Sequence, residues 1–270
     1  MAKQGVDMLK KCTLWLSVLL IGLYAPLSFA ATKADAPHGG WIVGGDLGLM
    51  FPGYADGADV HNLAEGLEPP AKDVDHYTIN RPSTNLSFSA FAGYRWDTEN
   101  KWLPHYSVAF RYQHLNASAA GGQIQLFSLP SFTNYDYNLS LGSNVFSVSG
   151  KVNVYEWRNF SPYVSFGLGL ASTSVSNYKE NEIDGGDPRI DGPAFNDHTN
   201  NNFMFNVGLG VDYNITQQLI VSLGYEYENL GKITSGNGIA LWSNDKLSLG
   251  TLSTSTILMS VTYQLPNNLF

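Results

Sequence analysis

Residues 203–213 read FMFNVGLGVDY, and this stretch decides the fold. Phenylalanine, valine, leucine and tyrosine occupy every odd position, and Met204, Asn206, Gly208, Gly210 and Asp212 lie between them. Successive side chains of a β-strand point to opposite faces, so the stretch predicts a strand with one apolar and one polar face. The same alternation returns at 219–227 and at 257–265.

Five earlier segments show the same alternation with more interruptions. They lie at 41–51, 86–96, 102–115, 145–157 and 162–171. Together with the three later segments they predict eight strands, each long enough to cross a bilayer at a tilt.

The connections between these segments alternate between short and long. The short ones cover 97–101, 158–161 and 214–218. The long ones cover about 52–85, 116–144, 172–202 and 228–256. Outer-membrane barrels have short periplasmic turns and long outer loops, so this rhythm predicts an up-and-down β-barrel with both termini in the periplasm.

The composition favours a membrane barrel over a helical membrane protein. Only 14% of the residues are charged, against 44% hydrophobic and 13% aromatic. After the N-terminal segment no apolar run approaches the roughly 18 residues that a helix needs to span hydrocarbon. A closed sheet is the other structure that satisfies every backbone hydrogen bond in lipid.

The N-terminal segment has the three parts of a secretory signal. Lys3, Lys10 and Lys11 precede an apolar run at 14–24, and small residues follow around Ala30. We therefore expect a signal peptide at 1–30 and the barrel at 31–270. Cleavage removes the only cysteine and leaves 12 basic against 22 acidic residues, a formal charge of −10. Nucleic acid is not an expected partner of so acidic a chain.

Aromatic residues gather at the expected periplasmic ends of the strands. This is where an interfacial girdle belongs in an outer-membrane barrel, whereas a soluble core would scatter these residues along the strand middles. The expected girdle comprises Trp41, Trp96, Trp102, Trp157, Tyr213 and Tyr263.

With the strands placed, the chain resembles the small eight-stranded outer-membrane barrels, such as the outer membrane protein A transmembrane domain and the opacity-type surface proteins. The last strand, ILMSVTYQL at 257–265, is similar to the terminal signal that the barrel-assembly machinery recognises in that family. Tyr263 and Leu265 would be its closing apolar pair. Phe270 either lies beyond the strand or belongs to an edge that continues through a bulge at Pro266. The resemblance implies the outer membrane of a Gram-negative bacterium, with its lipid and lipopolysaccharide as partners.

Six charged residues fall on the polar, inward face of the expected strands. A barrel of eight strands is just wide enough for side chains to fill it, and buried charges are tolerated only when paired. A polar plug of ion pairs is therefore one interpretation, and an ion path through the lumen is the other. The six residues are Asp46, Arg95, Arg111, Lys151, Asp212 and Glu226.

No residue is expected to be catalytic, and no metal or cofactor is expected. His105 and Ser107 share an inward face but lie at the periplasmic end, away from outer-leaflet lipid. His114 and Ser118 lie nearer the outside, but no acid accompanies them as a hydrolase would need. The acidic third loop lacks the ligand spacing of a calcium loop.

These patterns favour a non-enzymatic surface protein whose barrel anchors it and whose loops serve envelope structure, adhesion or host contact. A small porin or channel for small solutes is the alternative. A lipid hydrolase built on His114 is a third and weaker one.

Overall fold

The computed structural model describes residues 39–54, 57–61, 73–80, 84–183, 194–238, 243 and 245–266. The expected signal peptide at 1–30 and Phe270 lie outside these residues. Among the described residues, no helix is long and apolar enough to span a bilayer. The helices in this part of the chain are two single turns, η1 (Leu126–Ser128) and η2 (Pro130–Phe132).

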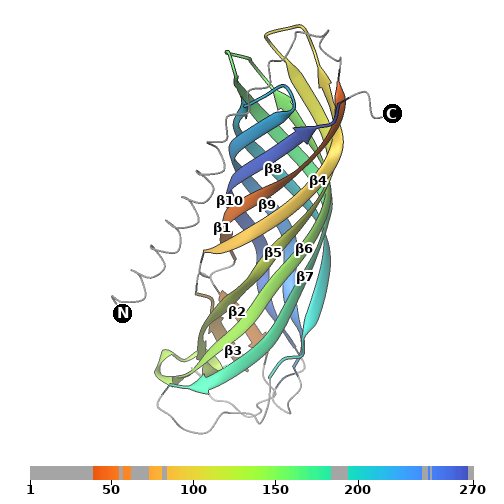
Figure 1. Cartoon of the computed structure of the whole chain (residues 1–270). Coiled ribbons are helices and arrows are strands. Elements are labelled where there is room, and N and C mark those ends of the chain that lie inside the picture. Colours follow the sequence, from red (N-terminus) through yellow and green to blue (C-terminus); the bar gives the residue numbers. More distant parts are fainter. Residues whose placement is uncertain are drawn as a thin grey trace, which may run out of the picture. The chain divides into compact units, whose positions relative to one another are not determined.

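Eight long antiparallel strands close a ring, as the sequence predicts (Figure 1). Each strand pairs with its neighbours along the ring, and the pairing of β1 with β10 and of β5 with β6 completes the closure. The ring order is β1 (Gly40–Gly53), β4 (Asn85–Asp97), β5 (His105–Gln125), β6 (Thr133–Asn153), β7 (Phe160–Glu182), β8 (His198–Asn214), β9 (Leu219–Asn237) and β10 (Lys246–Gln264).

Short turns connect the strands at one end of the ring, which we call the mouth. They occupy 98–104, 154–159 and 215–218, close to the short connections expected from the sequence. In the second of these turns, the backbone groups of Trp157 and Phe160 exchange two hydrogen bonds of 2.9 and 3.0 Å. Arg158 lies between them at a positive φ of 56°.

Two further strands that the sequence pattern missed lie inside the first expected long loop. They are β2 (Gly57–His61) and β3 (Val74–Thr78), and they form an antiparallel hairpin. β3 also pairs with β5, through His76 with Gln125 and Tyr77 with Ile124. In Figure 1 the hairpin lies at the lower end of the barrel, next to β5.

The other three expected loops are mostly strand, which corrects the expected strand lengths. β5 and β6 together cover most of 116–144, β7 continues to Glu182, and β9 continues to Asn237. The connections that remain are 126–132, 183–197 and 238–245. Six of the eight ring strands, β5 to β10, have 17 to 23 residues and therefore run well past the length that a membrane crossing requires.

The reason for the error is that each face of a long strand changes polarity along its length. On β7 the outward side chains are Val164, Phe166, Leu168 and Leu170, and serines follow them at 172, 174 and 176. The inward side of the same strand begins with serine and glycine and then becomes apolar, at Ala171 and Val175. A sequence pattern with one continuous apolar face therefore ends where the outward side of the strand becomes polar and the inward side becomes apolar.

The outward apolar side chains form a continuous apolar belt around the half of the ring nearer the mouth. Most of these side chains are at least two-fifths exposed, as expected of a surface that meets hydrocarbon rather than water. The belt includes Val43, Leu47, Leu49, Phe88, Val108, Phe110, Tyr112, Phe146, Val148, Val164, Phe166, Leu168, Leu170, Phe203, Phe205, Val207, Leu209, Val211, Leu223, Tyr225, Ile257, Met259 and Val261.

Beyond the belt the strands enclose an apolar core, and we call this part of the barrel, with β2 and β3, the head. Tyr77 of the hairpin is completely buried there and packs edge-on against Tyr137 and Phe195 at centroid distances of 5.4 and 6.1 Å. Leu230, Ile233, Leu247 and Leu249 complete the core from β9 and β10, each with no exposed surface. The head therefore has the polar outside and apolar inside of a water-soluble domain.

The strands have irregular positions near the boundary between the belt and the head. The ladder between β5 and β6 shifts register between Leu115 and Ser118, which moves the inward face of β5 from odd to even positions. Gly231 in β9 and Gly250 in β10 have φ values of +82° and +75°, a region that favours glycine. Such bulges re-aim the following side chains, so fixed alternation fails there.

Candidate functional site

The lumen behind the apolar belt is filled by polar side chains in tiers, and Arg111 is at the centre of one tier. Its Nη1 donates to both carboxylate oxygens of Glu226, at 2.7 and 2.9 Å. Its Nε lies 3.2 Å from Asp46 Oδ2 and donates to Ser89, which in turn donates to Asp46. The guanidinium thus joins β1, β4, β5 and β9 across the lumen.

Glu228 lies next to this tier and was missed by the sequence prediction. It has no exposed surface, and its Oε2 accepts hydrogen bonds from Gln113 Nε2 at 3.1 Å and Thr254 Oγ1 at 3.0 Å. Its Oε1 has no partner among the described residues. The expected strand ended one residue earlier, at Tyr227, so Glu228 fell in an expected loop. Its same-face spacing from Glu226 was the available signal.

Asp212 organises a second tier closer to the mouth. Its carboxylate accepts from Lys151 Nζ and Asn153 Nδ2, both at 2.9 Å, and from Ser222 Oγ at 2.6 Å. Lys151 Nζ also lies 4.5 Å from the centroid of the Tyr163 ring, within the range of a cation–π contact. β6, β8 and β9 are joined here.

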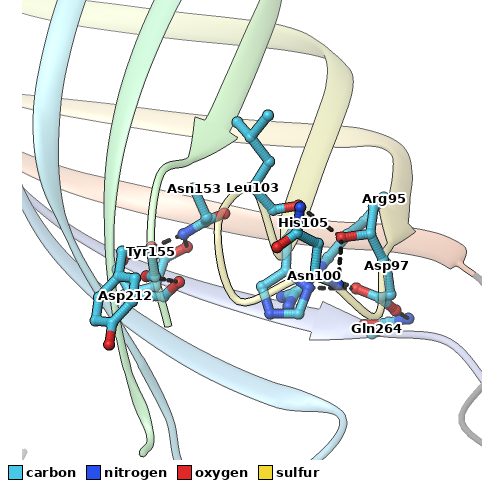
Figure 2. Close-up of polar contacts among 11 residues, drawn as sticks. Arg95, Asp97, Asn100, Leu103, His105, Asn153, Tyr155, Asp212 and Gln264 are labelled. Atoms are coloured by element: carbon cyan, nitrogen blue, oxygen red, sulfur yellow. Dashed lines mark hydrogen bonds and ion pairs between the residues drawn. The ribbon is translucent and has the colours of Figure 1, made fainter. Parts of the chain in front are cut away.

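At the mouth, Asp97 collects three donors from β4, β5 and β10 (Figure 2). Arg95 Nε lies 2.9 Å and His105 Nδ1 2.7 Å from Asp97 Oδ1, while Gln264 Nε2 donates to Oδ2 at 3.3 Å. The sequence analysis expected Arg95 to point inward but did not include Asp97, because Asp97 was assigned to a turn. The cluster fastens the end of β10 to the ends of β4 and β5 on either side of the first short turn.

All six expected lumen charges therefore lie on inward faces, but they form three groups rather than one network. Asp46, Arg111 and Glu226 form the first group, Lys151 and Asp212 the second, and Arg95 belongs to the mouth cluster. Counting Glu228 and Asp97, these groups hold five carboxylates against three permanent cations.

A cavity of about 100 Å³ lies between the tiers, lined by Asp46, Arg95, Arg111, Lys151 and Glu226 among others. Arg111 Nη2 and Ser149 Oγ on its lining have no partner among the described residues. Polar groups of this kind normally bind water when the space allows it. On the side away from the mouth, the lumen continues into the apolar core of the head.

The expected girdle residues lie at the mouth end of their strands or in the adjoining turns. Trp41, Trp102 and Trp157 are 54%, 68% and 61% exposed. They have aromatic neighbours: Trp41 packs edge-on against Tyr94 at 5.5 Å, Trp96 stacks on Tyr106 at 5.2 Å, and Trp102 packs against Tyr155 at 4.9 Å. Tyr213 lies 4.8 Å from Phe160, and the Tyr263 hydroxyl donates to Gln218.

The two histidines weighed for catalysis have different surroundings. His105 belongs to the mouth cluster, with Ser107 two residues further along the same strand and buried. His114 is exposed on the outer surface, and its Nδ1 lies 2.9 Å from Asn144 Oδ1. Asn144 is an amide, so it does not supply the carboxylate that orients histidine in a Ser-His-Asp triad.

The chain is similar in part to several known proteins. "Outer membrane protein PagN" of Salmonella typhimurium is 30% identical over 117 residues, which are 43% of this chain and 46% of PagN. The chain thus matches about half the length of this curated relative. Among solved structures, Neisserial surface protein A has 15% identity and a TM-score of 0.43, covering 83% of this chain and 97% of its own. OprG from Pseudomonas aeruginosa has 11% identity and a TM-score of 0.43, covering 84% and 97%.

A family model described as "Outer membrane protein beta-barrel domain" matches residues 18–264. This match includes every strand of the ring and of the head. The chain therefore belongs to the outer membrane protein β-barrel domain family, and it is an outer-membrane protein of a Gram-negative bacterium.

Proposed function

We propose that this protein is a non-enzymatic surface barrel whose belt anchors it in the outer membrane and whose head presents a fixed surface for adhesion or host contact. The observation that carries the proposal is the exchange of polarity along the strands. A head with a polar outside and an apolar core is suited to water, while the belt is suited to lipid.

The orientation of the barrel supports this role. The short turns 98–104, 154–159 and 215–218 all lie at the mouth, and short turns are periplasmic in outer-membrane barrels. The mouth also contains Gly40 at the start of β1 and Gln264 at the end of β10. The head is then on the outside of the cell.

The hairpin of the head is held by contacts at both ends. Tyr137 Oη donates to the carbonyl of Thr78 at 2.9 Å, next to the pairing of β3 with β5. At the other end, Ser243 Oγ donates to the carbonyl of His61 at 2.6 Å, and His61 Nδ1 lies 3.3 Å from Asp245 Oδ2. A surface that is ordered before binding loses less conformational entropy when a ligand binds.

The experiment replaces the hairpin, residues 57–78, with a short Gly-Ser linker. We expect the variant to keep the heat-dependent gel mobility of a folded barrel but to lose adhesion of the bacteria to host cells or matrix. Unchanged adhesion with normal surface abundance would contradict this role for the hairpin. Protease treatment of intact cells checks the orientation, because the head should be cut before any mouth turn.

A channel is the second candidate, and the cavity beside Arg95 and Lys151 is the observation that favours it. The ion pairs on one side of the cavity and the apolar core of the head argue against a continuous water path. We expect the purified protein to be silent in a planar bilayer. Unitary conductance that changes in Arg95→Ala or Lys151→Ala would instead establish a pore.

We also propose that β10 carries the signal for the barrel-assembly machinery. Tyr263 points outward near the mouth end of β10, and the backbone N–H of Leu265 donates to the carbonyl of Trp41 on β1 at 2.8 Å. Replacing Tyr263 and Leu265 together should lower the amount of folded barrel in the membrane, measured by heat-dependent gel mobility.

A further inference from the structure

A groove of about 560 Å³ crosses the outer face of β4, β5, β6 and β7 within the apolar belt. It lies at the end of the belt nearer the head, where β5 and β6 lead on toward the polar outer surface of the head. Unlike the lumen cavity, it is open to the membrane and is lined mainly by apolar side chains.

The pairing of β4 with β5 explains one side of the groove. Ala92 is opposite Phe110, and Ala90 is opposite Tyr112. Two small side chains thus stand beside two large ones, which leaves a low floor along β4. Phe110 is 75% exposed, more than any other large apolar side chain among the described residues, so it forms a free-standing wall.

The other side is formed on β6 and β7. Phe146 is opposite Leu170, and these side chains are 62% and 64% exposed. Between the two sides of the groove, the rings of Tyr112 on β5 and Phe146 on β6 contact each other with their centroids 5.0 Å apart.

A polar cap of His114 and Asn144 lies next to the groove on its side nearer the head, two residues beyond Tyr112 and Phe146 on their strands. Asn144 Oδ1 accepts from Tyr112 Oη at 2.8 Å and lies 2.9 Å from His114 Nδ1. His114 and Asn144 are paired across β5 and β6, and both are exposed. Among the described residues, neither Asn144 Nδ2 nor His114 Nε2 has a hydrogen-bond partner.

We propose that this groove is a binding site for one lipid of the surrounding bilayer. The acyl chain of the lipid packs against Phe110 and Phe146, and an ester or amide oxygen at its interfacial end accepts a hydrogen bond from Asn144 Nδ2. The site passes from an apolar groove to a polar cap, just as a lipid passes from its acyl chain to its polar interfacial groups.

The location of the groove selects a lipid as occupant. The groove belongs to the belt that faces hydrocarbon, so lipid chains are the medium at its surface. In that medium an apolar surface alone gives little preference, because lipid tails are as apolar as the side chains; close packing and hydrogen bonds provide it. The groove allows close packing of the acyl chain, and the polar cap offers a hydrogen bond.

The experiment measures binding of the first molecule of lipid A, the membrane anchor of lipopolysaccharide, to the delipidated protein in detergent micelles by native mass spectrometry. Phe146→Ala and Asn144→Leu should each weaken this binding by roughly fivefold, the effect of losing one ordinary contact or hydrogen bond. Two residues of β8 provide matched controls outside the groove. Phe203→Ala removes a side chain that is 63% exposed in the belt, and Asn201→Leu replaces an exposed amide; each should change binding by less than about twofold.

Two results would overturn the proposal. Equal weakening by the groove variant Phe146→Ala and the control Phe203→Ala would mean that lipid contacts are spread over the whole belt. Loss of a dimer in Phe146→Ala, without a change in lipid binding, would mean that a second copy of the chain occupies the groove. Heat-dependent gel mobility checks that every variant is folded.

Discussion

Arg111 and Glu226 lie on β5 and β9, at opposite sides of the eight-strand ring, and their side chains meet in the lumen at 2.7 Å. Both side chains are only 6% exposed. This buried ion pair therefore connects opposite sides of the barrel. Breaking it should lower the free energy of unfolding more than breaking an ion pair at a surface.

Replacing Arg111 with Met should lower the free energy of unfolding by about 3–5 kcal/mol, because Glu226 and Asp46 would lose their shared cation in a buried place. Urea titration in lipid vesicles, followed by heat-dependent gel mobility, measures the change. In the double variant Arg111→Met/Glu226→Gln the loss should be smaller than the sum of the two single losses. Additive losses would show that the pair is not coupled.

The two neighbouring glutamates of β9 should respond differently to the same substitution. Glu226→Gln removes a partner of Arg111 and should be destabilising. Glu228→Gln removes a buried carboxylate that has hydrogen bonds but, within the described part of the chain, no ion pair within 4.0 Å, so it should be neutral or stabilising by about 1 kcal/mol. The same urea titration compares them, and equal destabilisation would contradict this account of Glu228.

The exchange of polarity along β7 predicts that a charge is tolerated at one outward position and not at another. Leu168→Arg places a cation in the belt and should cost about 2–4 kcal/mol. Ser174→Arg places it on the outer surface of the head, six residues further along, and should change stability by less than about 0.5 kcal/mol. Similar costs at the two positions in vesicle unfolding would mean that the membrane extends over the head.

The attachment of the hairpin to the segment before β10 should weaken in acid. Partial burial raises the pKa of Asp245, but hydrogen bonds from the Lys246 backbone and from His61 outweigh it, and the pKa lies below its ordinary value. The folded form therefore gains stability from Asp245 above its unfolded pKa of about 4, and this gain is lost as the pH falls through the lower folded value.

Hydrogen exchange of β2 between about pH 5 and about pH 3 measures this effect, after correction for the intrinsic exchange rate. Asp245→Asn serves as the control, since it removes the titrating group. If β2 in the variant shows the same pH dependence as in the parent protein, Asp245 is not the cause.

The sequence predicted the membrane half of this fold because the belt has a simple period. Residues 203–213 alternate without a break, and the short turns punctuate the strands at regular places. These features depend only on neighbours along the chain. The same information was enough to place Arg111, Lys151 and Asp212 on inward faces.

The head could not be predicted in the same way, because its strands have the opposite solvent preference. Ala171 and Val175 point inward while Val164 and Leu170, on the same strand, point outward. Bulges such as that at Gly231 add a shift of phase. Asp97 was missed because it is the last residue of β4, where a difference of one residue decides the strand boundary. Glu228 was missed because the expected strand ended at Tyr227, where the membrane half of β9 passes into the head.

The exchange of polarity along unbroken strands also has a mechanical consequence. β6 and β7 pass from the head into the membrane as continuous backbone, with no linker between the two environments. A pull on the head during attachment would reach the lipid-embedded ladder directly, along covalent bonds and across rows of hydrogen bonds loaded in shear. β6 and β7 contain no hinge between the head and the membrane. The same strands therefore determine both the attachment of the head to its target and the anchoring of the barrel in the membrane.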